Sequence, residues 1–114
     1  MAAVESLRID VRPEPGRVVL ELAGELDLAA APRLQSEIEL AERDMPAMLV
    51  LDLGDLEFID SAGLRVILAA DQRAREQGRV FAVTHGSPQV ERLLELTGVD
   101  EHLQIVVSPD DVAA

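Results

Sequence analysis

Residues 48–64 read MLVLDLGDLEFIDSAGL, and this stretch decides the fold. Its first six residues, Met48–Leu53, are almost continuously apolar, which is typical of a strand covered on both faces. We expect Gly54–Asp60 to form a loop at the end of that strand. A helix should then run from about Ala62 to Gln77 and end at Gly78, because glycine adopts the positive φ angle that helix ends often need.

The residues before this stretch predict a β-hairpin and a first helix. Residues 7–12 and 18–22 alternate apolar and polar side chains, which indicates two half-exposed strands. The turn Pro13–Gly16 separates them. The helix should begin near Ala31, because Pro32 fits only in a first helical turn. Asp27 then lies on the loop before that helix.

The residues after this stretch continue the alternation of strands and helices. A buried strand is expected over Arg79–Thr84, followed by a helix that Ser87 caps and Gly98 ends. Residues 103–107 predict a last short strand. The expected fold is α/β, with a mixed, mostly parallel sheet that a β-hairpin opens and about three helices packed on it. We place a single domain over residues 1–114, with its core at about 5–108.

Composition narrows the classes of function. The 114 residues are 48% hydrophobic and 28% charged, as in a globular domain, and no apolar run is long enough to cross a membrane. The N-terminus lacks the pattern of a signal peptide, so we expect a cytoplasmic protein without membrane insertion. The net charge of −12 repels nucleic acid and anionic lipid, and favours either solubility alone or a basic partner surface.

Missing residue types exclude further chemistry. The chain has no cysteine, and all ten of its basic residues are arginine. This excludes disulfides, cysteine-ligated metals, a Walker A lysine and a Schiff-base enzyme. The two histidines, His85 and His102, have no second ligand at metal-binding spacing. We therefore expect no metal and no cofactor.

Ser61 is the main candidate for a functional residue. In α/β sheets, ligands and partners meet the loops beyond the carboxyl ends of the strands, and Glu25–Asp27 and Asp55–Ser61 are two such loops. Ser61 has two interpretations. It could simply cap the following helix, in which case its loss should cost about 1 kcal/mol. Alternatively, a phosphate there would add about −1.5 to −2 of charge beside Asp27, Glu57 and Asp60.

Two enzymatic alternatives are weak. The run Ile59–Gly63 is close to the Gly-x-Ser-x-Gly nucleophile elbow of hydrolases, but it lacks the first glycine, and nothing places a histidine beside Ser61. Asp52 lies near the end of a central strand, as in phospho-accepting receiver domains, but the lysine that those domains use is missing. We expect no catalytic residue and no enzymatic activity.

The motifs together resemble the STAS domain family, specifically bacterial anti-sigma-factor antagonists. The resemblance covers about residues 5–108 and is carried by Val50–Leu64, by the earlier Gly24–Asp27, by Ser87-Pro88 and by Leu96–Val99. It implies that the unphosphorylated protein binds an anti-sigma factor that is also a serine kinase, so that the sigma factor is released. The kinase inactivates the antagonist with ATP, and a metal-dependent protein phosphatase restores it.

The resemblance also assigns roles to residues. By position, Ser61 matches the phosphorylated serine, and Asp27 and Asp60 match acidic residues that flank the docking surface. We expect this partner-binding surface to include also Glu25, Glu57 and Gly63. Two departures concern the ends of helices. Ala30, at the expected cap of the first helix, offers no side-chain acceptor, so that end should be loose. The short C-terminus, residues 108–114, leaves no room for a last helix and could expose an apolar surface for a weak homodimer.

A different class of function stays open. STAS domains also serve as static, non-enzymatic subunits of transport systems and stress-signalling complexes, where the serine region is a constant interface. The intact serine in an acidic domain favours the phospho-switch.

Overall fold

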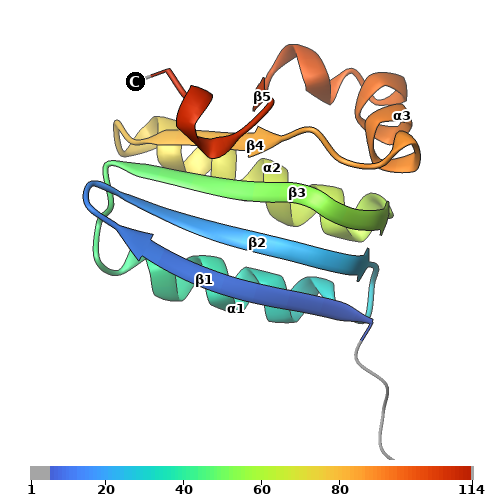
Figure 1. Ribbon diagram of the computed structural model, residues 1–114, viewed down its shortest axis with the longest axis horizontal. Coiled ribbons are helices and arrows are strands. Elements are labelled where there is room, and N and C mark those ends of the chain that lie inside the picture. The colour runs from blue at the N-terminus through green and yellow to red at the C-terminus, as the bar shows by residue number, and fades with distance from the viewer. Residues whose placement is uncertain (1–5, 114) are drawn as a thin grey trace, which may run out of the picture.

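The computed structural model describes residues 6–113, so Glu5, the first residue of the expected core, lies outside this range. Strands and helices alternate along the chain after an initial hairpin (Figure 1). Their bounds are β1 (Leu7–Glu14), β2 (Arg17–Leu26), α1 (Ala31–Glu42), β3 (Met48–Ile59), α2 (Ser61–Glu76), β4 (Val80–Thr84), α3 (Pro88–Leu96), η1 (Val99–Glu101), β5 (Gln104–Val106) and η2 (Pro109–Asp111).

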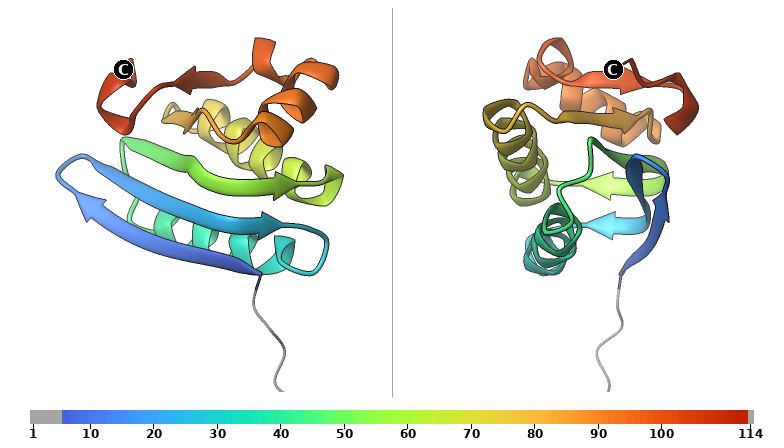
Figure 2. Two further views of the ribbon diagram at one scale, coloured as in Figure 1. Left: turned by 45° about the vertical axis from the view of Figure 1, so that its right-hand side comes forward. Right: turned by 90° about the vertical axis from the view of Figure 1, so that its left-hand side faces the viewer.

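The five strands form one mixed sheet in the order β1-β2-β3-β4-β5. β1 is antiparallel to β2, and the three remaining neighbouring pairs are parallel. α1 and α2 lie side by side on one face of the sheet (Figure 2), where Leu34, Ile38 and Ile67 are fully buried against the strands. The predicted α/β fold, with a hairpin, a mostly parallel sheet and three α-helices, is confirmed.

β3 is longer than expected, and the prediction of a loop over Gly54–Asp60 is wrong for all but its last residue. β3 continues to Ile59, and β2 continues to Leu26 beside it. The pairing of the two strands is irregular at these ends, because the six residues Glu21–Leu26 pair along the eight residues Asp52–Ile59. These irregularities break the two-residue alternation that identifies a strand in a sequence. Leu56 and Ile59 nevertheless point into the core.

The hairpin is also tighter than expected. β1 runs through Pro13 to Glu14, so the turn consists of Pro15 and Gly16 rather than Pro13–Gly16. β1 is an edge strand, and an edge tolerates proline because the missing N–H can face away from the neighbouring strand. Gly16 has a φ of +79°, which glycine adopts without strain.

The C-terminal segment lies on the sheet face opposite α1 and α2 (Figure 2). Arg17 anchors it by donating hydrogen bonds to the Pro109 carbonyl (3.0 Å) and to Asp110 Oδ1 (2.7 Å). The hydrogen bonds to Asp110 and Glu14 raise the pKa of the Arg17 guanidinium. Val19 of β2 is fully buried, whereas Val107 of the C-terminal segment is exposed. None of the helices within residues 6–113 has the length and apolar character needed to cross a membrane.

Candidate functional site

The ends of β2 and β3 bring the predicted loops together. Leu26 pairs with Ile59 as the last residue of each strand, so Asp27 and Asp60 follow at the same edge of the sheet. The Asp60 amide donates to the Leu26 carbonyl (3.2 Å), and the Leu28 amide donates to Asp60 Oδ2 (3.0 Å). The two segments are therefore joined by hydrogen bonds in both directions, as the position of Asp27 and Asp60 at neighbouring strand ends predicts.

Asp60, and not Ser61, is the N-cap of α2. Asp60 Oδ1 accepts hydrogen bonds from the amides of Ala62 (2.9 Å) and Gly63 (3.1 Å). The interpretation of Ser61 as the cap is therefore wrong, because the helix begins one residue earlier than expected and Ser61 is its first residue. The Ser61 side chain is exposed, and its hydroxyl has no hydrogen-bond partner among residues 6–113.

Gly63 allows the helix to approach the strand. A Cβ atom at this position would lie 2.5 Å from Leu26 Cγ and 2.9 Å from the Leu26 carbonyl oxygen, both far closer than van der Waals contact. Gly63 is buried, so it contributes to the site by setting the distance between α2 and β2. Any larger residue would push the start of α2, and Ser61 with it, away from the Asp27 loop.

Asp27 fastens the start of α1. Its carboxylate Oδ1 accepts from the Ala30 amide (3.0 Å), and its carbonyl accepts from the amides of Ala30 (3.1 Å) and Ala31 (2.9 Å). The missing capping side chain at Ala30 is confirmed, and Asp27 holds this helix end in its place. A loose start of α1 stays a prediction. Asp27 Oδ2 makes no hydrogen bond within the described part of the chain.

Glu25 and Glu57 lie on strands rather than on loops. Both side chains are exposed near the carboxyl ends of β2 and β3, and neither forms an ion pair among the described residues. They add negative charge to the end of the sheet that carries Ser61. Their contact with a partner stays a prediction.

Sequence reasoning missed Gln89 of α3. Its side-chain amide accepts from the Ile59 amide (2.9 Å) and donates to the Ile59 carbonyl (3.0 Å), as a neighbouring strand would. This pair of bonds fixes the residue directly before Asp60 and Ser61. A glutamine in a first helical turn carries no signal of such a role in the sequence.

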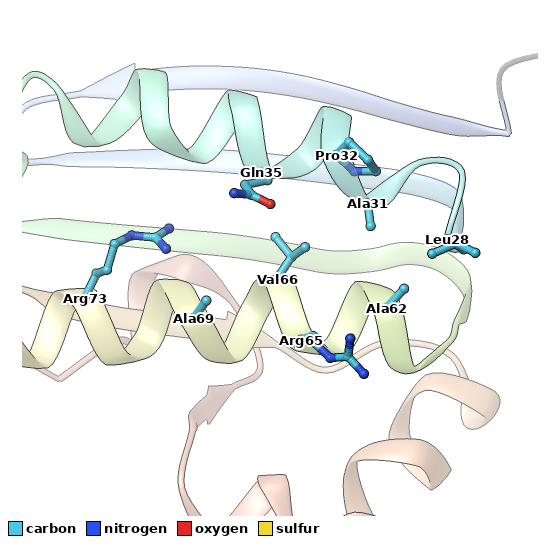
Figure 3. Close-up of a pocket in the computed structure, with 9 residues that line it drawn as sticks. All are labelled: Leu28, Ala31, Pro32, Gln35, Ala62, Arg65, Val66, Ala69 and Arg73. Carbon is cyan, nitrogen blue, oxygen red and sulfur yellow. The ribbon is translucent and has the colours of Figure 1, made fainter.

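A groove of about 350 Å³ runs between α1 and α2 and begins beside Ala62, the residue after Ser61 (Figure 3). Leu28, Ala31 and Pro32 line one side, and Ala62 and Val66 line the other. The exposed Leu28 stands at its end, next to the Asp60 carboxylate that holds its amide. The site thus combines a free hydroxyl, acidic side chains and an adjacent groove, which is partly apolar and is also lined by Gln35, Arg65 and Arg73.

The alternative sites find no support in the geometry. His85 Nδ1 lies 3.0 Å from Glu91 Oε1 and not against Ser61, and Asp52 accepts a hydrogen bond from Thr84 (3.0 Å). Among residues 6–113, no three His, Cys, Asp or Glu side chains gather as metal ligands would.

Comparison with known proteins identifies the family of this chain. Residues 8–112 match the STAS domain. The chain is 31% identical over 105 residues to the anti-sigma-F factor antagonist RsfB of Mycobacterium tuberculosis, over 92% of this chain and 85% of that protein. It is 29% identical to the anti-sigma-B factor antagonist of Bacillus subtilis, over 88% of this chain and 91% of that protein.

Solved structures agree in fold. An anti-sigma factor antagonist from Mycobacterium paratuberculosis superposes with a TM-score of 0.86 at 31% identity, over 97% of this chain and 94% of that one. Unphosphorylated SpoIIAA, an anti-sigma factor antagonist, shares the fold with a TM-score of 0.77 at 19% identity, over 91% of each chain. The match over residues 8–112, together with these likenesses, means that the chain belongs to the STAS domain family.

Proposed function

We propose that this protein is an anti-sigma-factor antagonist whose binding is switched off by phosphorylation of Ser61. The relatives that carry this name match nearly the whole chain. The observation that carries the proposal is the division of roles between Asp60 and Ser61. Asp60 makes all the capping hydrogen bonds, so the Ser61 hydroxyl is free to react without loss of the helix start.

A switch by phosphorylation of Ser61 requires two partner proteins, a kinase and a phosphatase. An anti-sigma factor with serine kinase activity binds the unphosphorylated protein and releases its sigma factor. The kinase then transfers the γ-phosphoryl group of ATP: the Ser61 Oγ–P bond forms, the bond to the bridging oxygen of ADP breaks, and the hydroxyl proton passes to a base of the kinase. A protein phosphatase hydrolyses the phosphoester and restores the hydroxyl.

Electrostatics explains how the phosphate would end the complex. Ser61 lies at an end of the sheet that already carries Asp27, Asp60, Glu25 and Glu57. A phosphate would add about −1.5 to −2 of charge beside these carboxylates. Its hydration and its bulk beside the groove would keep a partner from closing on this surface.

We further propose that the protein catalyses no reaction of its own. No histidine or carboxylate among the described residues hydrogen-bonds to the Ser61 hydroxyl, so no general base is in place to make it a nucleophile. Weak self-association stays a prediction.

The test is an affinity capture from the cytosol of the native organism with the wild-type protein, Ser61→Ala and Ser61→Glu. Ser61→Ala should enrich a kinase of the ATPase fold, and the same kinase with ATP should phosphorylate only the wild type at Ser61. Ser61→Glu should lose it, because a carboxylate mimics part of the phosphate charge. Ser36→Glu is the matched control, since Ser36 is exposed on α1 and should leave capture unchanged.

Retention of one assembly without a kinase by all variants would overturn the proposal. That outcome would make the protein a static STAS subunit, with Ser61 as an ordinary interface residue.

A further inference from the structure

We infer that Arg65 binds the phosphate of phosphorylated Ser61 within the same chain and so stabilises the phosphorylated state. This inference rests on the proposed phosphorylation of Ser61. It concerns what receives the phosphate once it is there.

Three of the usual phosphate ligands of a helix start are already in use. A phosphate at a helix N-terminus normally binds the free amides of the first turn. Here Asp60 Oδ1 takes the amides of Ala62 and Gly63, and the Asp60 carbonyl takes that of Leu64 (3.0 Å). The phosphate therefore meets a helix end that is already covered by a carboxylate, and it needs another donor to offset the repulsion.

Arg65 is positioned to be that donor. Ser61 and Arg65 are four residues apart on α2, which places their Cβ atoms roughly 5–6 Å apart on the same face. Helical side chains lean towards the N-terminus, and Figure 3 shows the Arg65 side chain running along α2 towards the turn that carries Ala62. An anion four residues before a cation is also the more favourable order for such a pair.

Arg65 is also available. The other arginines of α2 are engaged, since Arg73 pairs with Glu42 (3.0 Å) and Arg75 with Asp71 (3.0 Å). Arg65 is exposed and has no hydrogen bond or ion pair among residues 6–113. Its guanidinium can offer two parallel N–H donors to two phosphate oxygens, a geometry that phosphate favours.

The experiment installs phosphoserine at position 61 during translation, with an expanded genetic code, in the full chain. Phosphorus NMR then follows the second ionisation of the phosphate with pH. The proteins compared are the wild type, Arg65→Gln and Arg65→Lys. Arg43→Gln is the control, because Arg43 is exposed and follows the C-terminal end of α1, whereas Ser61 lies near the N-terminal end of that helix. Circular dichroism of each variant checks the fold.

The phosphate of the wild type should titrate about half a pKa unit lower than that of Arg65→Gln, because the guanidinium favours the dianion. Arg65→Lys should restore part of this difference, and Arg43→Gln should match the wild type. In about 1 M NaCl the difference should shrink. Equal titration of the wild type and Arg65→Gln in low salt, with both folded, would overturn the inference.

This outcome is independent of the proposed function. The phosphate is installed without a kinase, so an unaltered titration refutes the role of Arg65 even where a kinase phosphorylates Ser61. Conversely, a shifted titration with no kinase captured by Ser61→Ala would refute the phospho-switch and leave the Arg65 contact standing.

Discussion

Among the α-helices within residues 6–113, α2 has Ser61 as its first residue and α3 has Ser87 directly before it, and of these two serines only Ser87 caps its helix. Ser87 is the N-cap of α3: its Oγ accepts from the Val90 amide (3.4 Å) and donates to the Glu57 carbonyl (3.0 Å). Ser61 opens α2 with no such bond, because Asp60 caps that helix. A serine at a helix start is thus free for chemistry where a neighbouring residue already satisfies the first-turn amides.

The two serines differ because α2 begins one residue earlier than the sequence suggests, which makes Ser61 the first helical residue instead of the N-cap. Tertiary contacts fix this helix start. Gln89 clamps Ile59 as the last residue of β3, and Gly63 has to face Leu26 for α2 to pack against β2. Between these two constraints only Asp60 can take the N-cap position. The comparison predicts three substitutions with clearly ordered effects on stability.

Asp60→Ala should have the largest effect. It removes the cap of α2 and the bond to the Leu28 amide, so the free energy of unfolding should fall by about 2 kcal/mol. Urea denaturation followed by circular dichroism measures this loss. Asp60→Asn keeps the Oδ1 acceptor and should recover more than half of it. A loss below about 0.5 kcal/mol for Asp60→Ala would mean that Asp60 is not the cap.

Ser87→Ala should have the intermediate effect. Its loss removes the cap of α3 and the bond that ties α3 to β3, and the free energy of unfolding should fall by about 1 kcal/mol. The same urea titration applies, with Ser87→Thr as the control that keeps the hydroxyl. A neutral result for Ser87→Ala would remove the contrast between the two serines.

The fold was predictable from the sequence wherever one local signal decided the outcome. Pro32 places the start of α1 at Ala31, and the pair Ser87-Pro88 marks the start of α3, because a proline is tolerated in a first turn and nowhere later in a helix. The apolar run at the start of β3 likewise identified a buried strand. In each case the residue type alone restricts the backbone.

The end of β3 was not predictable, because its pattern depends on the neighbouring strand. Glycine and three acidic residues over residues 54–60 are typical of a loop, and the irregular pairing with β2 hides the alternation. The N-cap of α2 in the candidate site was not predictable for the same reason, because tertiary contacts decide it. Asp60 and Ser61 are both good caps, so only the strand end and Gly63 decide between them.

Ser61→Ala should have the smallest effect on stability and the clearest meaning. The Ser61 hydroxyl has no hydrogen-bond partner among residues 6–113, and alanine is a better helix former than serine. The free energy of unfolding should therefore stay within about 0.5 kcal/mol of the wild type in the same urea titration, as for other exposed positions. If Ser61 caps α2, the free energy of unfolding should fall by about 1 kcal/mol, as for Ser87→Ala. Such a loss would show that Ser61 contributes to the N-cap together with Asp60. A neutral substitution leaves the hydroxyl without a structural reason to be there, and phosphorylation then supplies the reason.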